Sequence, residues 1–171
     1  MSDAAMEAPE APAGERVTIR QFRPGDVEGL LALEARCYPP ERRMHYGTLR
    51  PLLEDPAAAL LVIEGGAADA ARVCGGLIVR RDAEQLTVVA LSIDPDYRRL
   101  GLGRRLMDWA RLACLAAGLP ALGVPLEAEN AAGAAFLASL GFSPAPDGAP
   151  YFTGPEDGRL WRKPAASQEP P

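Results

Sequence analysis

Arginine and glycine residues gather in one short stretch of the chain, Arg98-Arg99-Leu100-Gly101-Leu102-Gly103. A hydrophobic, strand-like run ends just before this stretch, and a helix-like run begins within it. The N-terminus of a helix presents unpaired N–H groups and the positive end of a dipole, which suits an anion. Glycines let the backbone approach phosphate oxygens without an intervening Cβ atom. The spacing therefore predicts a site for a phosphate-like anion.

Other interpretations of the same stretch stay open. The two glycines could serve turn geometry alone, and Arg98, Arg99, Arg104 and Arg105 could simply be solvated. A dinucleotide-binding loop fits less well, because its third glycine would fall at Leu106. A nucleotide-binding P-loop fails because no Gly-Lys-Ser/Thr ending follows.

The flanking sequence predicts the elements that must position this loop. Alternating or β-branched apolar runs indicate strands, and apolar residues at helical spacing indicate helices. Asp26 is expected to cap the first helix, and Pro51 is expected to shorten or kink the second, whose apolar candidates are Met44, Leu49, Leu52 and Leu53. The expected strands are Val17–Phe22, Ala58–Glu64, Arg72–Arg81, Gln85–Ile93, Ala121–Leu126 and a terminal pair within Phe142–Lys163. The two later helices are expected at about Leu102–Ala117 and Asn130–Leu140. This order predicts an α/β domain, a mixed sheet of about six to seven strands flanked by about four helices.

Composition sets the wider frame. The 171 residues suit a single domain over 16–163, with 1–15 and 164–171 as disordered tails rich in Pro, Ala, Glu and Ser. A formal net charge of −5 argues against nucleic acid or an anionic membrane as a partner. The sequence begins with no signal-peptide pattern and contains no apolar run long enough to span a bilayer, so a cytoplasmic location is expected. Three widely spaced cysteines, Cys37, Cys74 and Cys114, match neither a disulfide framework nor a metal site.

The motif Arg98-x-x-Gly101-x-Gly103 resembles the R/Q-x-x-G-x-G/A motif of the GNAT superfamily of N-acetyltransferases. The resemblance extends through Asp94-Pro95-Asp96-Tyr97, Glu129-Asn130-Ala131-Ala132 and Ser139-Leu140-Gly141-Phe142, and within the superfamily it is most like the branch that acetylates the N-terminal alanine of a ribosomal protein. It implies acetyl-CoA as co-substrate, with no metal. The backbone of Leu91, Ser92 and Ile93 would hold the pantetheine arm and polarise the thioester. The loop Arg98, Arg99, Leu100, Gly101, Leu102, Gly103 and Arg104 would cradle the pyrophosphate. Asn130 would contact the cofactor, cap the next helix, or do both.

The resemblance fails at the residues that move protons. Many GNAT enzymes carry a tyrosine general acid where this chain has Leu137, and the ribosomal-protein branch carries a glutamate base where this chain has Pro125. Three substitutes are candidates for catalysis: Glu127, placed by strand periodicity on the same face as Pro125; Glu84, through a water relay; and Tyr151, in the terminal hairpin.

The expected reaction is direct transfer of an acetyl group from acetyl-CoA to a primary amine, a protein N-terminus or a small molecule, in a ternary complex. The alternative is an acyl-CoA-binding or sensing module with little or no catalysis. The segment from Cys37 to Tyr46 is the candidate for acceptor selection, with Arg42 and Arg43 suiting an acidic acceptor. His45 within it is a further, weaker candidate base. The sequence leaves open the acceptor, the acyl chain length and the oligomeric state, with a homodimer among the options.

Overall fold

The computed structural model describes residues 6–7, 16–66, 70–145 and 158–165. They fall into two compact units, each made of two stretches of chain: residues 1–78 with 90–106, and residues 79–89 with 107–171. Strands β4 (Arg72–Arg81) and β5 (Leu86–Ile93) and helix α3 (Leu102–Ala116) contribute to both units. Among the described residues, no helix is both long and apolar enough to cross a membrane.

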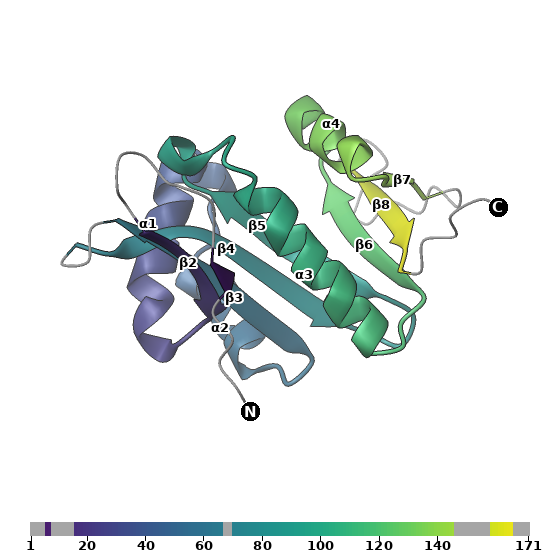
Figure 1. The fold of residues 1–171 in the computed structure, drawn as a ribbon, viewed down its shortest axis with the longest axis horizontal. Helices are drawn as coiled ribbons and strands as arrows, with labels where there is room; N and C mark the ends of the chain where they lie inside the picture. Colours follow the sequence, from purple (N-terminus) through teal and green to yellow (C-terminus); the bar gives the residue numbers. More distant parts are fainter. Residues whose placement is uncertain (1–5, 8–15, 67–69, 146–157, 166–171) are drawn as a thin grey trace. The chain divides into compact units, whose positions relative to one another are not determined.

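The first unit is a twisted run of strands in the order β1-β2-β3-β4-β5. Its remaining elements are β1 (Met6–Glu7), β2 (Arg16–Gln21), α1 (Val27–Cys37), α2 (Tyr46–Glu54) and β3 (Ala58–Gly66). Strand β2 is antiparallel to both β1 and β3, and its register sets Ile19 opposite Ile63. In Figure 1, α1 lies behind these strands and the start of α3 lies in front of them.

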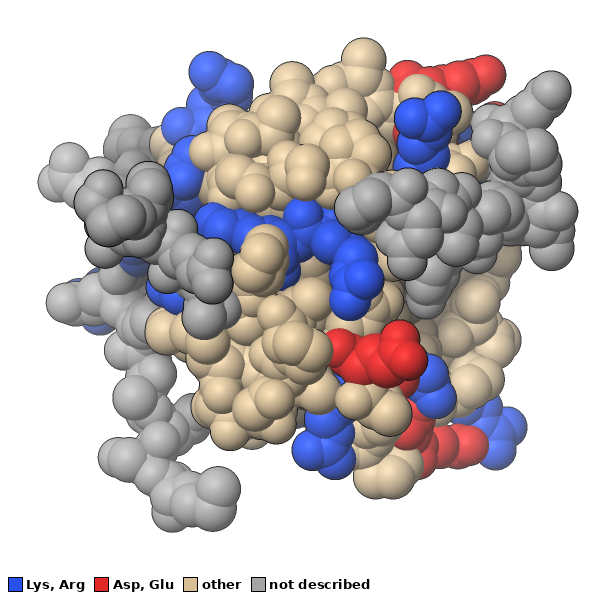
Figure 2. Space-filling view, turned by 90° about the vertical axis from the view of Figure 1, so that its right-hand side faces the viewer, with Lys and Arg blue, Asp and Glu red and all other residues tan. Residues whose placement is uncertain are grey.

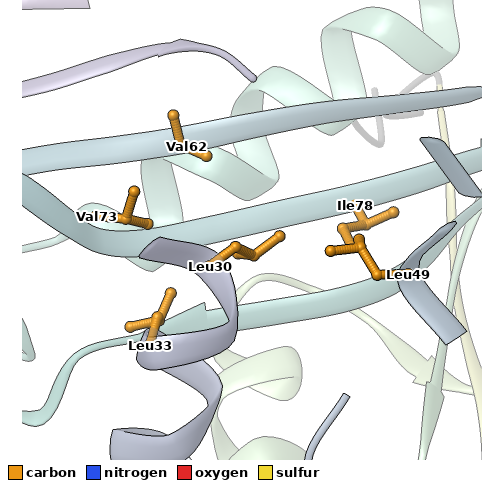
Figure 3. Packing of buried hydrophobic residues seen from close by; sticks show 6 residues of the cluster. All are labelled: Leu30, Leu33, Leu49, Val62, Val73 and Ile78. Carbon is orange, nitrogen blue, oxygen red and sulfur yellow. The ribbon is translucent and has the colours of Figure 1, made fainter. Parts of the chain in front are cut away.

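The core of this unit lies where α1 and α2 meet the sheet. Leu30 and Leu33 of α1 and Leu49 of α2 pack with Val62 of β3 and with two residues of β4, Val73 and Ile78, as Figure 3 shows. Leu33, Leu49 and Val62 have no exposed surface. Leu30 and Leu33 stand three residues apart, so the helix presents both to the same neighbour. Burial of such side chains contributes about 1.5–3 kcal/mol each, and this is what holds α1 against the strands.

The second unit contains the hairpin ends of β4 and β5, most of α3, and the C-terminal elements. These elements are β6 (Ala121–Leu126), α4 (Ala131–Ser139), β7 (Ser143–Pro144) and β8 (Arg159–Pro164), in the strand order β4-β5-β6-β8-β7. Strand β6 runs parallel to β5, with Leu86 opposite Leu122, and antiparallel to β8. Gly141, two residues after the end of α4, has a φ of 81°, which suits glycine. The Lys163 ammonium stabilises that end by donating to the carbonyl of Leu140 at 2.6 Å.

The predicted α/β architecture is confirmed, and most boundaries fall within two residues of those expected. Three details differ. Met6–Glu7, inside the expected N-terminal tail, pair with β2 as a strand. At the other end β8 reaches Pro164 and Ala165 is buried, beyond the expected boundary at residue 163. The rest of both expected tails lies outside the described residues.

The third difference concerns Asp26, which occupies the residue before α1 but does not cap it with its side chain. Its carboxylate instead accepts two guanidinium hydrogen bonds from Arg20, each at 2.8 Å, and one from the backbone N–H of Arg23 at 2.7 Å. A bidentate arginine outcompetes a single cap bond because both of its donors are charged. The pair ties β2 to the start of α1.

This pair makes the stability of the protein depend on pH. The hydrogen bonds from Arg20 hold the pKa of Asp26 below its usual value. A lowered pKa in the folded state stabilises the fold above the unfolded-state pKa of about 4, and that stability is lost as the pH falls through the folded value. Asp26→Asn should lower the free energy of unfolding by about 1–3 kcal/mol at pH 7. Urea titrations should show this difference shrinking below pH 4.

Glu54→Gln is the control, because Glu54 pairs with Arg50 on the exposed surface of α2. That change should cost about 0.5 kcal/mol or less. A difference between wild type and Asp26→Asn that stays constant from pH 7 to pH 2.5 contradicts the assignment.

Candidate functional site

The turn that follows β5 is anchored by a buried carboxylate. Asp94 is 1% exposed and accepts from the Arg36 Nε of α1 at 2.6 Å and from the backbone N–H of Asp96 at 3.1 Å. Its own N–H donates to the carbonyl of Cys74 on β4 at 2.9 Å. Arg36 also donates to the carbonyl of Val73 at 2.8 Å. These bonds fix the direction in which the chain leaves the sheet.

Backbone geometry in the following loop is unusual at two residues. Arg99 has φ 68° and Gly101 has φ 75°, both in the left-handed region, with Leu100 between them at negative φ. For arginine this conformation costs about 1–2 kcal/mol. When successive residues alternate between left- and right-handed backbone conformations, their N–H groups turn toward one side. The N–H groups then form a concavity that can bind an anion. Nothing lies within 4 Å of the position that a Cβ atom on Gly101 would take, so this side of the loop is open.

Helix α3 starts at this loop and adds its own donors. Arg105 N–H donates to the carbonyl of Gly101 at 3.1 Å, which begins the helical ladder. The amides of Leu102, Gly103 and Arg104 therefore precede any acceptor within the helix. Arg99 and Arg104 are exposed and carry positive charge at the same end. The loop residues from Arg99 to Arg104 therefore lie in one turn at the N-terminal end of α3.

Arg98 differs from the other loop arginines. Its Nε donates to the carbonyl of Ile93 at 3.0 Å, so its side chain folds back on the end of β5. Two side chains at the end of α1 also donate to β5: the hydroxyl of Tyr38, the residue after the helix, to the Leu91 carbonyl at 3.3 Å, and the Cys37 thiol to the Ile93 carbonyl at 3.4 Å. Residues two apart on a strand present their backbone groups on the same edge. The edge of β5 that carries the Leu91 and Ile93 carbonyls therefore accepts hydrogen bonds from side chains.

Ser92, between these two residues, points to a partner that the sequence analysis did not select. Its hydroxyl donates to Oε1 of Glu34 at 2.6 Å, and both residues are buried. The other Glu34 oxygen accepts the backbone N–H of Met44 at 3.1 Å. One sequence signal could have found Glu34: it continues the apolar face of α1 at four residues from Leu30, where a carboxylate is out of place.

The predicted catalytic residues are placed as follows. Strand β6 ends at Leu126, so Glu127 lies after the strand. The alternation of faces along a strand therefore does not place the Glu127 side chain on the same face as Pro125. Glu84 lies exposed in the turn before β5, at the opposite end of that strand from Leu91. Tyr151 is outside the described residues. Asn130 caps α4, since its side chain accepts the N–H of Gly133 at 2.8 Å.

The segment between α1 and α2 is the candidate for acceptor selection. Arg43 donates to the carbonyls of Tyr38 at 2.8 Å and Ala35 at 3.1 Å, so it caps the end of α1. The Arg43 side chain is therefore engaged within the fold. His45 is exposed and precedes α2.

Charge is unevenly distributed over the surface. Although the chain carries a net −5, Figure 2 shows basic side chains collected toward the middle of one face, with acidic side chains gathered below them. The net charge therefore does not describe the local field at any one site.

Comparison with known proteins agrees with this geometry. A mycothiol acetyltransferase from Beutenbergia cavernae is 30% identical over 149 residues, 83% of this chain and 50% of that protein. The ribosomal protein bS18-alanine N-acetyltransferase of Escherichia coli is 37% identical over 62 residues, 36% of this chain and 42% of that one. The chain thus spans about half the length, or less, of the curated relatives it matches.

Solved structures share the fold. The crystal structure of the Escherichia coli ribosomal-protein-S18-alanine N-acetyltransferase matches with a TM-score of 0.71 at 23% identity, covering 90% of this chain and 97% of that one. The PaiA N-acetyltransferase of Thermoplasma acidophilum, solved in complex with coenzyme A, matches with a TM-score of 0.70 at 16% identity, covering 86% and 98%.

The model of the acetyltransferase (GNAT) domain matches residues 56–144, which is a little more than half of the chain. The matched range includes β5, the Asp94 turn, the loop with two left-handed residues and helix α3. The chain therefore belongs to the GNAT acetyltransferase family.

Proposed function

We propose that this protein is an N-acetyltransferase that moves an acetyl group from acetyl-CoA to a primary amine by direct transfer in a ternary complex. The observation that carries the proposal is the turn from β5 into α3, with its left-handed residues and the unpaired amides of Leu102, Gly103 and Arg104. A pyrophosphate needs several N–H donors and positive charge at one place, and this turn supplies both.

Membership of the GNAT family supports acetyl-CoA as the acetyl donor. A structural neighbour was solved with coenzyme A, and the names of both curated relatives describe acetyl transfer. The pyrophosphate of acetyl-CoA would lie on the loop from Arg98 to Arg104, with Asn130 as a further proposed contact. The backbone of Leu91, Ser92 and Ile93 would hold the pantetheine arm.

Acetyl transfer to an amine sets three requirements. The amine must be neutral, the thioester oxygen needs a hydrogen-bond donor as negative charge develops, and the leaving thiolate needs a proton. Backbone N–H groups near Leu91 and Ile93 are suited to donate to the thioester oxygen. Holding donor and acceptor together lowers the barrier further by removing the entropy of their encounter. Glu127, Glu84 and Tyr151 are candidates for proton transfer.

The acceptor is proposed from chemistry shared by the relatives. Two of their names specify N-acetyl transfer, one of them to an alanine of a ribosomal protein. A peptide N-terminus or a small-molecule amine therefore fits as the acceptor.

One observation favours a second candidate, an acyl-CoA-binding module without catalysis. Leu137 is 2% exposed inside α4, and Pro125 lies in β6 opposite Leu160 of β8. Neither residue can donate or accept a proton through its side chain. The two candidates agree on binding of acetyl-CoA and differ on release of its thiol.

The glycine at the start of α3 provides a test of the donor site. Gly101→Val places a β-branched residue at φ 75°, which the left-handed region does not accommodate, so the loop must rearrange. Isothermal titration should show the Kd for acetyl-CoA rising at least tenfold. Gly118→Val is the matched control, because Gly118 has φ 68°, equally open surroundings and a place just beyond the other end of α3. It should lose similar stability and keep its affinity. Equal loss of affinity in both variants contradicts the assignment.

Thiol release distinguishes the enzyme from the module. Wild-type protein incubated with acetyl-CoA and a panel of peptides and small amines should release one thiol for each amide formed, measured by a thiol-reactive dye and by mass spectrometry. Saturable acetyl-CoA binding without thiol release across the panel would establish the module instead. In an active protein, loss of turnover in Glu127→Gln, Glu84→Gln or Tyr151→Phe assigns proton transfer to that residue.

A further inference from the structure

A buried carboxylate, a buried hydroxyl and a phenol are linked beside the end of β5. We propose that Glu34, Ser92 and Tyr38 form a proton relay for acetyl transfer, in which Tyr38 meets the reacting groups and Glu34 stores the proton. This inference rests on the proposed function, because it takes Leu91–Ile93 as the place of the thioester.

Geometry connects the three groups in series. The Ser92 hydroxyl donates to Glu34 Oε1 at 2.6 Å, and the Tyr38 hydroxyl lies 3.5 Å from Ser92 Oγ. Tyr38 also donates to the Leu91 carbonyl at 3.3 Å. The hydrogen bond from Tyr38 to Leu91 is long, so the phenol hydrogen is weakly held and can turn to Ser92 Oγ or to a new partner. Hydrogen bonds of catalytic groups are often long before the substrate binds.

The two ends of the relay differ in exposure. Glu34 is 5% exposed and Ser92 is 4% exposed, whereas Tyr38 is only partly buried. A proton taken up by Glu34 is therefore shielded from bulk water, and Tyr38 is the member that a substrate can reach.

Burial raises the pKa of the Tyr38 hydroxyl above its usual value, so the phenol is protonated at neutral pH. The smaller influences on this pKa are the Ser92 hydrogen bond and Arg98, which lower it, and Glu34 and Cys37, which raise it. Asp94 is a further charge in this cluster, since it acts on Cys37. A phenol that stays protonated can donate its hydrogen while its oxygen accepts another, as a relay requires.

The steps balance over one turnover. As the amine nitrogen bonds to the thioester carbon, its proton passes to the Tyr38 oxygen, the Tyr38 proton passes to Ser92, and the Ser92 proton passes to Glu34. Collapse of the tetrahedral intermediate breaks the carbon–sulfur bond. The proton then returns from Glu34 through Ser92 and Tyr38 to the thiolate. The products are the amide and the CoA thiol, with the relay restored.

The relay predicts graded kinetic losses with intact donor binding. Tyr38→Phe keeps the ring and should lower kcat by about 10²–10⁴-fold, the range for loss of general acid–base catalysis, with the Kd for acetyl-CoA within about twofold of wild type. Ser92→Ala should lower kcat at least tenfold, and Ser92→Thr, which restores a hydroxyl, should recover most of it. Glu34→Gln, which cannot take up the proton, should lower kcat as Ser92→Ala does.

The controls are Ser139→Ala, which removes an exposed hydroxyl of α4, and Glu28→Gln, which removes an exposed carboxylate of α1. Both should retain wild-type kcat. If Glu34→Gln does not fold, Tyr38→Phe and Ser92→Ala decide the question. Wild-type turnover that persists within about threefold in Tyr38→Phe and Ser92→Ala overturns the relay alone. Wild-type protein that binds acetyl-CoA and releases no thiol overturns the proposed function and the relay together.

Discussion

The buried ion pair between Asp94 and Arg36 is the constraint on which the site depends. A carboxylate with 1% exposure is stable only when charged or polar donors surround it, and Arg36, Arg72 and the Asp96 amide provide them. Because Arg36 belongs to α1 and also donates to β4, the pair connects the helix, the sheet and the turn after β5. Loss of one partner would leave the other with unmet charge, which typically costs about 3–5 kcal/mol.

The contacts of Asp94 hold this turn in place, and so they fix the direction of the neighbouring backbone groups. Backbone amides that bind an anion depend on their direction, and small displacements weaken them. Before the Asp94 turn, Glu34 accepts hydrogen bonds from the Ser92 hydroxyl and the Met44 N–H. Helix α1 thus holds the end of β5 at two residues, Ser92 and Asp94.

Much of the fold was predictable because hydrophobic periodicity encodes it. The ranges for β4 and β6 match the expected ones, and Gly118 and Gly141 mark helix ends as expected. The loop from Arg98 to Arg104 was selected for its glycine and arginine residues, and it lies between β5 and α3 as expected. Hydrogen bonds between side chains were harder to predict, because they join residues that are distant in sequence. Glu34, for example, accepts from Ser92, which lies 58 positions along the chain. Asp26 illustrates the same limit, since a cap and an ion pair use the same carboxylate and only the fold decides between them.

At position 99, the residue that would be best for the stability of the left-handed backbone differs from the residue that gives the loop its positive charge. Glycine there would relieve about 1–2 kcal/mol of steric strain, and it would also remove a cation from the loop. Selection for stability alone would therefore drive position 99 away from arginine, whereas selection for anion capture would keep it. Thermostabilising protocols that score only the folded state would choose glycine at position 99, and they would remove one positive charge from the loop.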